Sequence, residues 1–203
     1  LAAAWRMDQE NFMESLPSIS EMKLRIGVGR VGNEGIPPYS SLGLLETTEA
    51  YFGENEIAKG SGPQTSANSG LKWETTDQYN IGLDLSIFDS RLDVTVEYYH
   101  KKTRDLLQRV GIPSSTGFDT MWTNSGNVVN RGLEVSTNFN VINNEDFSWN
   151  MNANISFNEN KIGGLEGDQF GAELWYGVDQ FFIQRNGMPI GTMYGYVEDG
   201  FYD

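Results

Sequence analysis

The sequence predicts an all-β fold of long antiparallel strands, of the kind that forms a segment of a transmembrane β-barrel. Three observations lead to this prediction. Apolar and polar residues alternate in phase through a long hairpin at residues 73–99, other stretches repeat the alternation, and the connections between strands are alternately short and long. Bacterial outer-membrane barrels combine these features, with short turns in the periplasm and long loops outside.

The hairpin at residues 73–99 carries the clearest pattern. With a two-residue turn at positions 89–90, Ile87 faces Leu92, and every second pair along the two arms is apolar. The pairs in between are polar, as where Ser86 faces Asp93. One face of the ribbon is therefore apolar and the other polar. Each arm runs for about 15 residues, roughly 50 Å, whereas strands of globular proteins average five or six residues.

The chain before the hairpin repeats the alternation once. In order, we expect the end of a strand at 3–7, a turn at 16–21, a strand at 22–31 and a long loop at 32–70. Glycine, proline, asparagine and serine dominate the loop, as is usual for irregular segments. Its strand-like pieces at 39–45 and 50–52 favour an internal hairpin.

The chain after the hairpin continues in the same way. We expect a long connection at 103–124, strands at 128–142 and 147–160 joined by a turn at 143–146, a long loop at 161–189 and a further strand from 192 to 197. Asn150, Asn152 and Asn154 occupy alternate positions of one strand, which is costly in a dry core but suits a water-filled lumen. Aromatic residues gather near strand ends, like the two interfacial girdles of a membrane barrel.

Composition excludes several classes of function. The net charge is −14, from 28 acidic and 14 basic residues, so the chain lacks the basic surface that nucleic acid requires. It has no cysteine and a single histidine, His100, so we predict no nucleophilic triad, no zinc site and no cofactor. Glu166 and Asp168 offer oxygen ligands for Ca²⁺, but the EF-hand spacing is missing and solvated loop carboxylates are the favoured interpretation.

Six segments resemble SusC/RagA-type TonB-dependent transporters. They are LRIGVGRVGN at 24–33, LKWETTDQYNIGLD at 71–84, YYHKKTRDLL at 98–107, PSSTGF at 113–118, NSGNVVNRGLE at 124–134 and GMPIGTMYGY at 187–196. The resemblance covers nearly the whole chain in the right order. It implies about seven strands of a 22-stranded barrel. Residues 1–203 would form a partial barrel domain, with the plug domain and the TonB box absent from this chain.

The resemblance also implies a function. Members of the family import glycans, oligosaccharides or peptides through the outer membrane of Bacteroidetes. Their partners are a SusD-like surface lipoprotein that forms a lid, and the TonB–ExbB–ExbD complex, which acts through the N-terminal region. The barrel contacts outer-membrane lipid, and neither enzymatic activity nor nucleic-acid binding is expected.

Aromatic residues in the predicted outer loops are candidates for contact with the substrate, because sugar rings stack on aromatic side chains. They are Trp122, Phe170, Trp175, Tyr176, Phe181 and Phe182. An alternative is that these rings pack the loops together or dock the lid.

Two other classes of protein remain open from the sequence. A soluble secreted β-sandwich, acting as a carbohydrate-binding or adhesin-like module, would pack its apolar faces on each other. A secreted glycosidase needs a spatially matched pair of carboxylates; the sequence contains many acidic residues but does not show how they pair.

Overall fold

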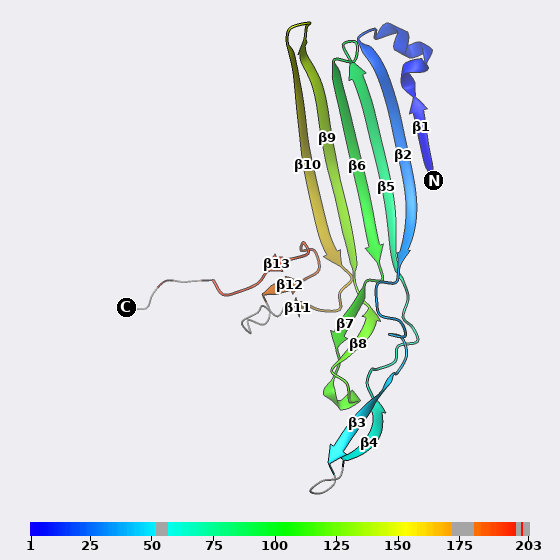
Figure 1. The fold of residues 1–203 in the computed structure, drawn as a ribbon, viewed down its shortest axis with the longest axis vertical. Coiled ribbons are helices and arrows are strands. Elements are labelled where there is room, and N and C mark those ends of the chain that lie inside the picture. Colours follow the sequence, from blue (N-terminus) through cyan, green and yellow to red (C-terminus); the bar gives the residue numbers. More distant parts are fainter. Residues whose placement is uncertain (52–56, 172–180, 198–199, 201–203) are drawn as a thin grey trace. The chain divides into compact units, whose positions relative to one another are not determined.

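The computed structural model describes residues 1–51, 57–171, 181–197 and 200. Its main feature is a six-stranded sheet with the order β1-β2-β5-β6-β9-β10 (Figure 1). The strands are β1 Ala2–Arg6, β2 Ile19–Asn33, β5 Glu74–Ile87, β6 Leu92–Arg104, β9 Asn127–Asn143 and β10 Ser148–Gly163. The prediction of an all-β antiparallel fold with long strands is confirmed.

Short elements occupy the connections. Two hairpins pair β3 Leu45–Tyr51 with β4 Ile57–Pro63, and β7 Leu107–Gly111 with β8 Thr120–Asn124. A small sheet joins β11 Gln169–Gly171, β12 Phe182–Gln184 and β13 Thr192–Met193. The described helices are three 3₁₀ segments, η1 Met7–Gln9, η2 Asn11–Ser15 and η3 Ser114–Thr116. Among the residues described, no helix has the length and apolar character to span a membrane.

The chain divides into two compact units. Unit 1 comprises residues 1–31, 76–102 and 128–203, and therefore most of the six-stranded sheet together with β11, β12 and β13. Unit 2 comprises residues 32–75 and 103–127, and therefore the hairpins β3–β4 and β7–β8. Unit 2 is built from the two long connections that follow β2 and β6.

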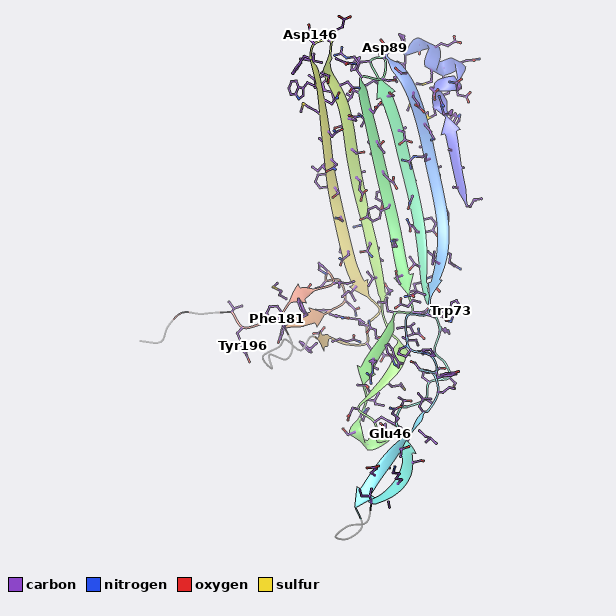
Figure 2. The ribbon with its side chains drawn as sticks, in the orientation of Figure 1. Glu46, Trp73, Asp89, Asp146, Phe181 and Tyr196 are labelled. Carbon is purple, nitrogen blue, oxygen red and sulfur yellow. The ribbon has the colours of Figure 1, made fainter. Side chains whose placement is uncertain are left out.

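The β5–β6 hairpin has the predicted register. The Ser86 hydroxyl donates to Asp93 Oδ1 at 2.6 Å, as expected for residues that face each other. The Arg91 N–H donates to the Phe88 carbonyl at 3.2 Å and closes a turn around Asp89 and Ser90. The φ angles of Asp89 and Ser90 are 54° and 61°, as in the type I′ turn that matches the twist of paired strands. Asp89 and Asp146, in the next short turn, lie at the same end of the sheet (Figure 2).

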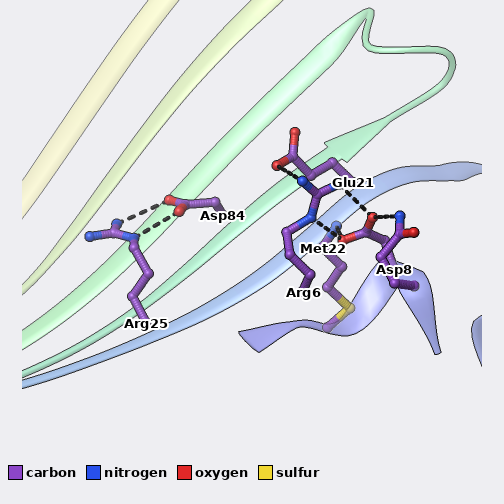
Figure 3. A network of polar contacts seen from close by, with 7 residues as sticks. Arg6, Asp8, Glu21, Met22, Arg25 and Asp84 are labelled. Atoms are coloured by element: carbon purple, nitrogen blue, oxygen red, sulfur yellow. Dashed lines mark hydrogen bonds and ion pairs between the residues drawn. The ribbon is translucent and has the colours of Figure 1, made fainter. Parts of the chain in front are cut away.

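The turn predicted at 16–21 is present but shorter: the Ile19 N–H donates to the Leu16 carbonyl at 3.1 Å, and β2 begins at Ile19. Before this turn, the connection between β1 and β2 contains η1 and η2, which the sequence analysis did not predict. Asp8 holds this segment in place (Figure 3): its carboxylate accepts bonds of 2.9 and 2.7 Å from Arg6 and one of 3.4 Å from the Met22 N–H. The hydrogen bond from Arg6 lowers the pKa of Asp8 well below its usual range.

Three other expectations differ from the structure. The internal hairpin of the first long loop exists, but its strands are β3 and β4 rather than residues 39–45 and 50–52. The β7–β8 hairpin lies where only a loop was expected. The strand predicted at 192–197 is limited to β13, which pairs with β12 and not with the six-stranded sheet. A seventh strand of the main sheet is therefore not present among the described residues.

The described residues form almost no hydrophobic core. The buried apolar side chains are Met13, Val128, Ile162, Leu165 and Ile183. A β-sandwich buries the facing sides of two sheets, and no second layer covers the apolar side of the described six-stranded sheet. The soluble β-sandwich interpretation is therefore wrong.

Candidate functional site

The six-stranded sheet has two chemically distinct faces. Its apolar face exposes large side chains along β2, β5, β6, β9 and β10: Ile26, Val28, Ile81, Tyr98, Leu133, Trp149, Met151, Ile155 and Phe157. Its polar face carries residues that bond from strand to strand, Arg25, Asp84, Ser86, Asp93, Thr95 and Glu97. Glu134, Ser136, Asn152 and Asn154 line shallow hollows on the same face. An uncovered apolar face this large marks contact with a membrane or a partner.

A network of charged residues on the polar face joins three strands. Arg25 of β2 donates to both carboxylate oxygens of Asp84 on β5, at 2.7 and 3.0 Å (Figure 3). Its guanidinium also lies 3.6 Å from Glu97 Oε2 on β6, and Thr95 donates to Asp84 at 3.2 Å. We call Arg25, Asp84, Thr95 and Glu97 the Arg25 cluster.

Gly82 makes room for the Arg25 cluster. A Cβ atom at Gly82 would lie 2.9 Å from Arg25 Nη2. Because glycine has no side chain, the guanidinium can pass over β5 and approach β6. The sequence alternation places Gly82 on the polar face, but it gives no indication that an arginine from β2 covers it.

Ion pairs also occur on the apolar side of the strands, close to the ends that lead into the long connections. Arg30 on β2 contacts Asp77 on β5 at 2.5 Å. Glu159 on β10 contacts both Arg131 at 2.6 Å and Lys161 at 2.5 Å. Charged pairs are costly in hydrocarbon, so these residues indicate where the apolar band ends.

The β11–β12–β13 sheet brings together three of the six predicted substrate-contacting residues. Phe170 packs against Tyr194 with ring centroids 5.2 Å apart, and Phe181 packs edge-on against Phe182 at 5.1 Å. The Tyr194 N–H donates to the Phe181 carbonyl at 2.9 Å, which links the two ring pairs. Tyr194 was missed by sequence reasoning because its alternating neighbours predict a strand of the main sheet.

The other three predicted residues do not join this group in the described structure. Trp122 belongs to unit 2, where it lies on β8 and its carbonyl accepts a hydrogen bond of 2.9 Å from Asn68. Trp175 and Tyr176 lie outside the described residues.

An ion pair joins Asp168, just before β11, to Arg185, just after β12. Arg185 Nε and Nη2 donate to the two carboxylate oxygens of Asp168 at distances between 2.5 and 3.0 Å. These bonds lower the pKa of Asp168. Both carboxylate oxygens of Asp168 therefore accept hydrogen bonds from Arg185. In the described part of the chain, no group of three or more acidic, histidine or cysteine side chains is placed to hold a metal ion.

The Asp168–Arg185 pair predicts an acid-sensitive sheet. The folded-state pKa of Asp168 is depressed, so the pair stabilises the sheet above the unfolded pKa of about 4 and loses this effect as the pH falls through the folded pKa. Hydrogen exchange of the full-length protein should show residues 182–184 losing protection on acidification. Arg185→Gln should lower protection at pH 7 and remove the pH response. An unchanged response in Arg185→Gln would contradict the assignment.

Comparisons with known proteins agree with this geometry. Residues 3–202 match the family model described as TonB dependent receptor-like, beta-barrel. TonB-dependent receptor P39 of Formosa agariphila is 40% identical over 98% of this chain, and TonB-dependent receptor SusC of Bacteroides thetaiotaomicron is 31% identical over all of it. The chain spans 18% and 20% of these two relatives, about a fifth of their length.

A solved structure resembles the fold as well. The RagAB peptide transporter matches 93% of this chain with a TM-score of 0.75 and 27% sequence identity, and the match covers 20% of the transporter chain. A family match over almost every residue, together with a six-stranded sheet that has one apolar and one polar face, identifies the apolar face as the lipid side and the polar face as the lumen side. The chain therefore belongs to the TonB-dependent receptor β-barrel family and forms part of an outer-membrane barrel.

Proposed function

We propose that this chain is a wall segment of an outer-membrane transporter that imports glycans, oligosaccharides or peptides together with a SusD-like surface lipoprotein. The observation that carries the proposal is the similarity to both SusC and RagAB along nearly the full chain. RagAB is a peptide transporter, and SusC is a TonB-dependent receptor. The two-faced sheet suits such a wall, because lipid and an aqueous path lie on opposite sides of it.

In this proposal the other parts of the transporter lie outside residues 1–203. A plug domain and a TonB box would belong to the N-terminal region of the transporter, where TonB–ExbB–ExbD supplies energy. The segment itself would position the substrate path and perform no covalent chemistry, so we propose that it is not an enzyme. The single histidine, His100, and the absence of cysteine support this view.

A deletion experiment tests the proposed function. The gene for the full-length protein would be deleted in the source strain, and uptake of labelled oligosaccharides and peptides would be measured. We expect the deletion to abolish uptake of one substrate class and plasmid complementation to restore it, with loss of TonB giving the same defect. Unchanged uptake of every substrate in the deletion strain would contradict the proposal.

Partner and location are tested on the same strain. An antibody against residues 161–189 should detect, in the outer-membrane fraction, a band several times larger than 22.7 kDa. Purification of that protein should recover a lipoprotein in equal amount. A band near 22.7 kDa in the soluble fraction would contradict the account.

The aromatic side chains of the β11–β12–β13 sheet are proposed substrate contacts, together with Trp122, Trp175 and Tyr176. Phe181→Ala should raise the dissociation constant for the substrate about two- to tenfold, since an aromatic contact is worth about 0.5–1.5 kcal/mol. The matched control is Phe12→Ala, which removes an exposed ring from η2, next to the short-turn end of the sheet. Equal affinities for the two variants would contradict a role of Phe181 in binding.

A further inference from the structure

Unit 2 contains a pocket that the sites described above do not include. Its volume is about 440 Å³, within the range of about 300–1,000 Å³ that is typical of small-molecule sites. Two stretches, residues 34–41 and 71–73, form most of its wall, and Leu107 completes it. Residues 71–73 begin the LKWE sequence on which the family resemblance rests, but their side chains have no role in the two-faced sheet.

Tyr39 reaches the pocket through a strained turn. The Ser40 N–H donates to the Pro37 carbonyl at 3.3 Å, and Pro38 and Tyr39 are the central residues of this turn. Tyr39 has a φ of 67°, at a position where type II turns normally require glycine or asparagine. Its side chain is 70% exposed, so burial does not compensate for the strain. A strained, exposed aromatic residue at a pocket indicates a binding role.

Trp73 supplies a second ring with a fixed position. A Cβ atom at Gly32 would lie 3.0 Å from Trp73 Cε3, so the indole rests closely on the backbone of Gly32. Trp73 is nevertheless 62% exposed. The ring is thus held against the protein but remains accessible to a ligand.

Hydrogen bonds join the segments that form the pocket wall. The Glu74 carboxylate accepts from the Leu107 N–H and from Asn33 Nδ2, each at 2.9 Å. The Asn124 side chain accepts from the Lys72 N–H at 2.7 Å and donates to the Lys72 carbonyl at 2.8 Å. These bonds preorganise the wall, which lowers the entropic cost of binding.

Two side chains of opposite charge line the pocket, one a hydrogen-bond acceptor and the other a donor. The Glu34 carboxylate and the Lys72 ammonium line it, and both residues are exposed. Within the part of the chain that the structure describes, neither side chain has an ion-pair partner. The two are the only charged residues of the described lining, so the charge of the wall sums to zero.

We propose that this pocket binds a neutral saccharide. A pyranose ring has apolar C–H faces that stack on Trp73 or Tyr39, and hydroxyl groups that donate to Glu34 and accept from Lys72. The balanced charge disfavours uronic or sulfated sugars, because an added anion would face Glu34 without a second cation. The inference rests on the proposed import function and selects the glycan among its substrate classes.

The test uses the full-length transporter purified from outer membranes with any lipoprotein that accompanies it. Calorimetry would compare neutral oligosaccharides of glucan, xylan and mannan with alginate oligosaccharides and a tryptic peptide pool. We expect binding of a neutral oligosaccharide, weakened at least tenfold by Trp73→Ala and by Glu34→Ala. The matched control is Glu46→Ala, which removes an exposed carboxylate of the same unit from β3 and should leave affinity unchanged.

Tyr39→Gly separates binding from folding. Glycine relieves the positive φ and removes the ring, so this variant should reach the outer membrane at wild-type level while its affinity falls at least fivefold. Preference for alginate oligosaccharides or peptides, or wild-type affinity in Trp73→Ala, Glu34→Ala and Tyr39→Gly, would overturn the saccharide site. The deletion strain tests the import function separately from the pocket. If uptake is abolished in that strain but the pocket variants bind saccharide with wild-type affinity, the import function stands and the saccharide site is refuted.

Discussion

Replacing Gly132 with alanine should sharply reduce the amount of folded transporter in the outer membrane. A Cβ atom at Gly132 would lie 2.7 Å from Tyr99 Cε1 and 2.8 Å from the Phe157 carbonyl oxygen. Real Cβ atoms do not approach other atoms so closely, and a backbone oxygen of β10 cannot move without opening the β9–β10 pair. Overpacking typically costs about 1–3 kcal/mol, and we expect the upper end here.

The measurement is heat-modifiable migration of the full-length barrel on unboiled gels, together with its level in outer membranes. Gly29→Ala is the matched control, because no atom lies within 4 Å of the Cβ position at this β2 glycine. Adding Tyr99→Ala to Gly132→Ala should restore folding only in part, since the Phe157 oxygen remains in place. Wild-type levels of Gly132→Ala would show that β9 and β10 do not approach each other as described.

Substitution of Arg25 is expected to give the second large effect, a loss of barrel stability. Arg25→Gln should destabilise the barrel wall by about 1–2 kcal/mol, because hydrogen bonds to charged groups contribute about 1.5–3 kcal/mol and solvent screening reduces this value. The side chains of Arg25 and Asp84 are 37% and 30% exposed, so some screening is present. Removal of the arginine leaves Asp84 and Glu97 without their shared cation.

Asp84→Asn should cost less than Arg25→Gln, because Arg25 then keeps Glu97. Denaturant unfolding of the purified full-length barrel measures both differences. Arg131→Gln is the control: it also removes an arginine from a barrel strand, but Glu159 retains Lys161 at 2.5 Å, so we expect less than about 0.5 kcal/mol. Equal destabilisation by Arg25→Gln and Arg131→Gln would contradict a structural role of the cluster.

The long strands could be predicted because the alternation of polar and apolar residues carries their register. A one-residue slip would turn every side chain to the wrong face, so Ile155 and Asn154 must keep their sides along the whole strand. The turn at Asp89 and Ser90 followed from the same register, and its positive φ angles agree with it. Strand ends were predicted to within a few residues.

The connections were harder to predict because local contacts decide them. The η1–η2 segment depends on Asp8, which accepts hydrogen bonds from Arg6 and Met22. The alternation of polar and apolar residues does not predict such contacts. The β7–β8 hairpin is too short for alternation to be recognised. Residues 194–197 alternate like a strand but do not form one, since β13 ends at Met193.

Aromatic residues of the candidate site could be predicted from the sequence where they lie in expected loops. Residues that join the site only when distant segments fold together could not. Phe170 and Phe181 were recognised as loop aromatics, but their partner Tyr194 was not. The pocket in unit 2 requires Tyr39 and Trp73 from two distant segments to line one cavity. Only the fold shows that the Trp73 indole lies against Gly32 and that the Glu74 side chain bonds to Asn33 and Leu107.

The central claim is that one face of the six-stranded sheet contacts lipid and the other an aqueous lumen. Adjacent residues of β10 test it directly, because Ile155 is an exposed residue of the apolar face and Asn154 lines the polar one. Each would be replaced by cysteine in the full-length protein, with any other cysteines removed, and labelled with a fluorophore in membranes. The account predicts that a lipid-phase nitroxide quenches the label at residue 155 and iodide the label at residue 154. Equal or reversed quenching would contradict it.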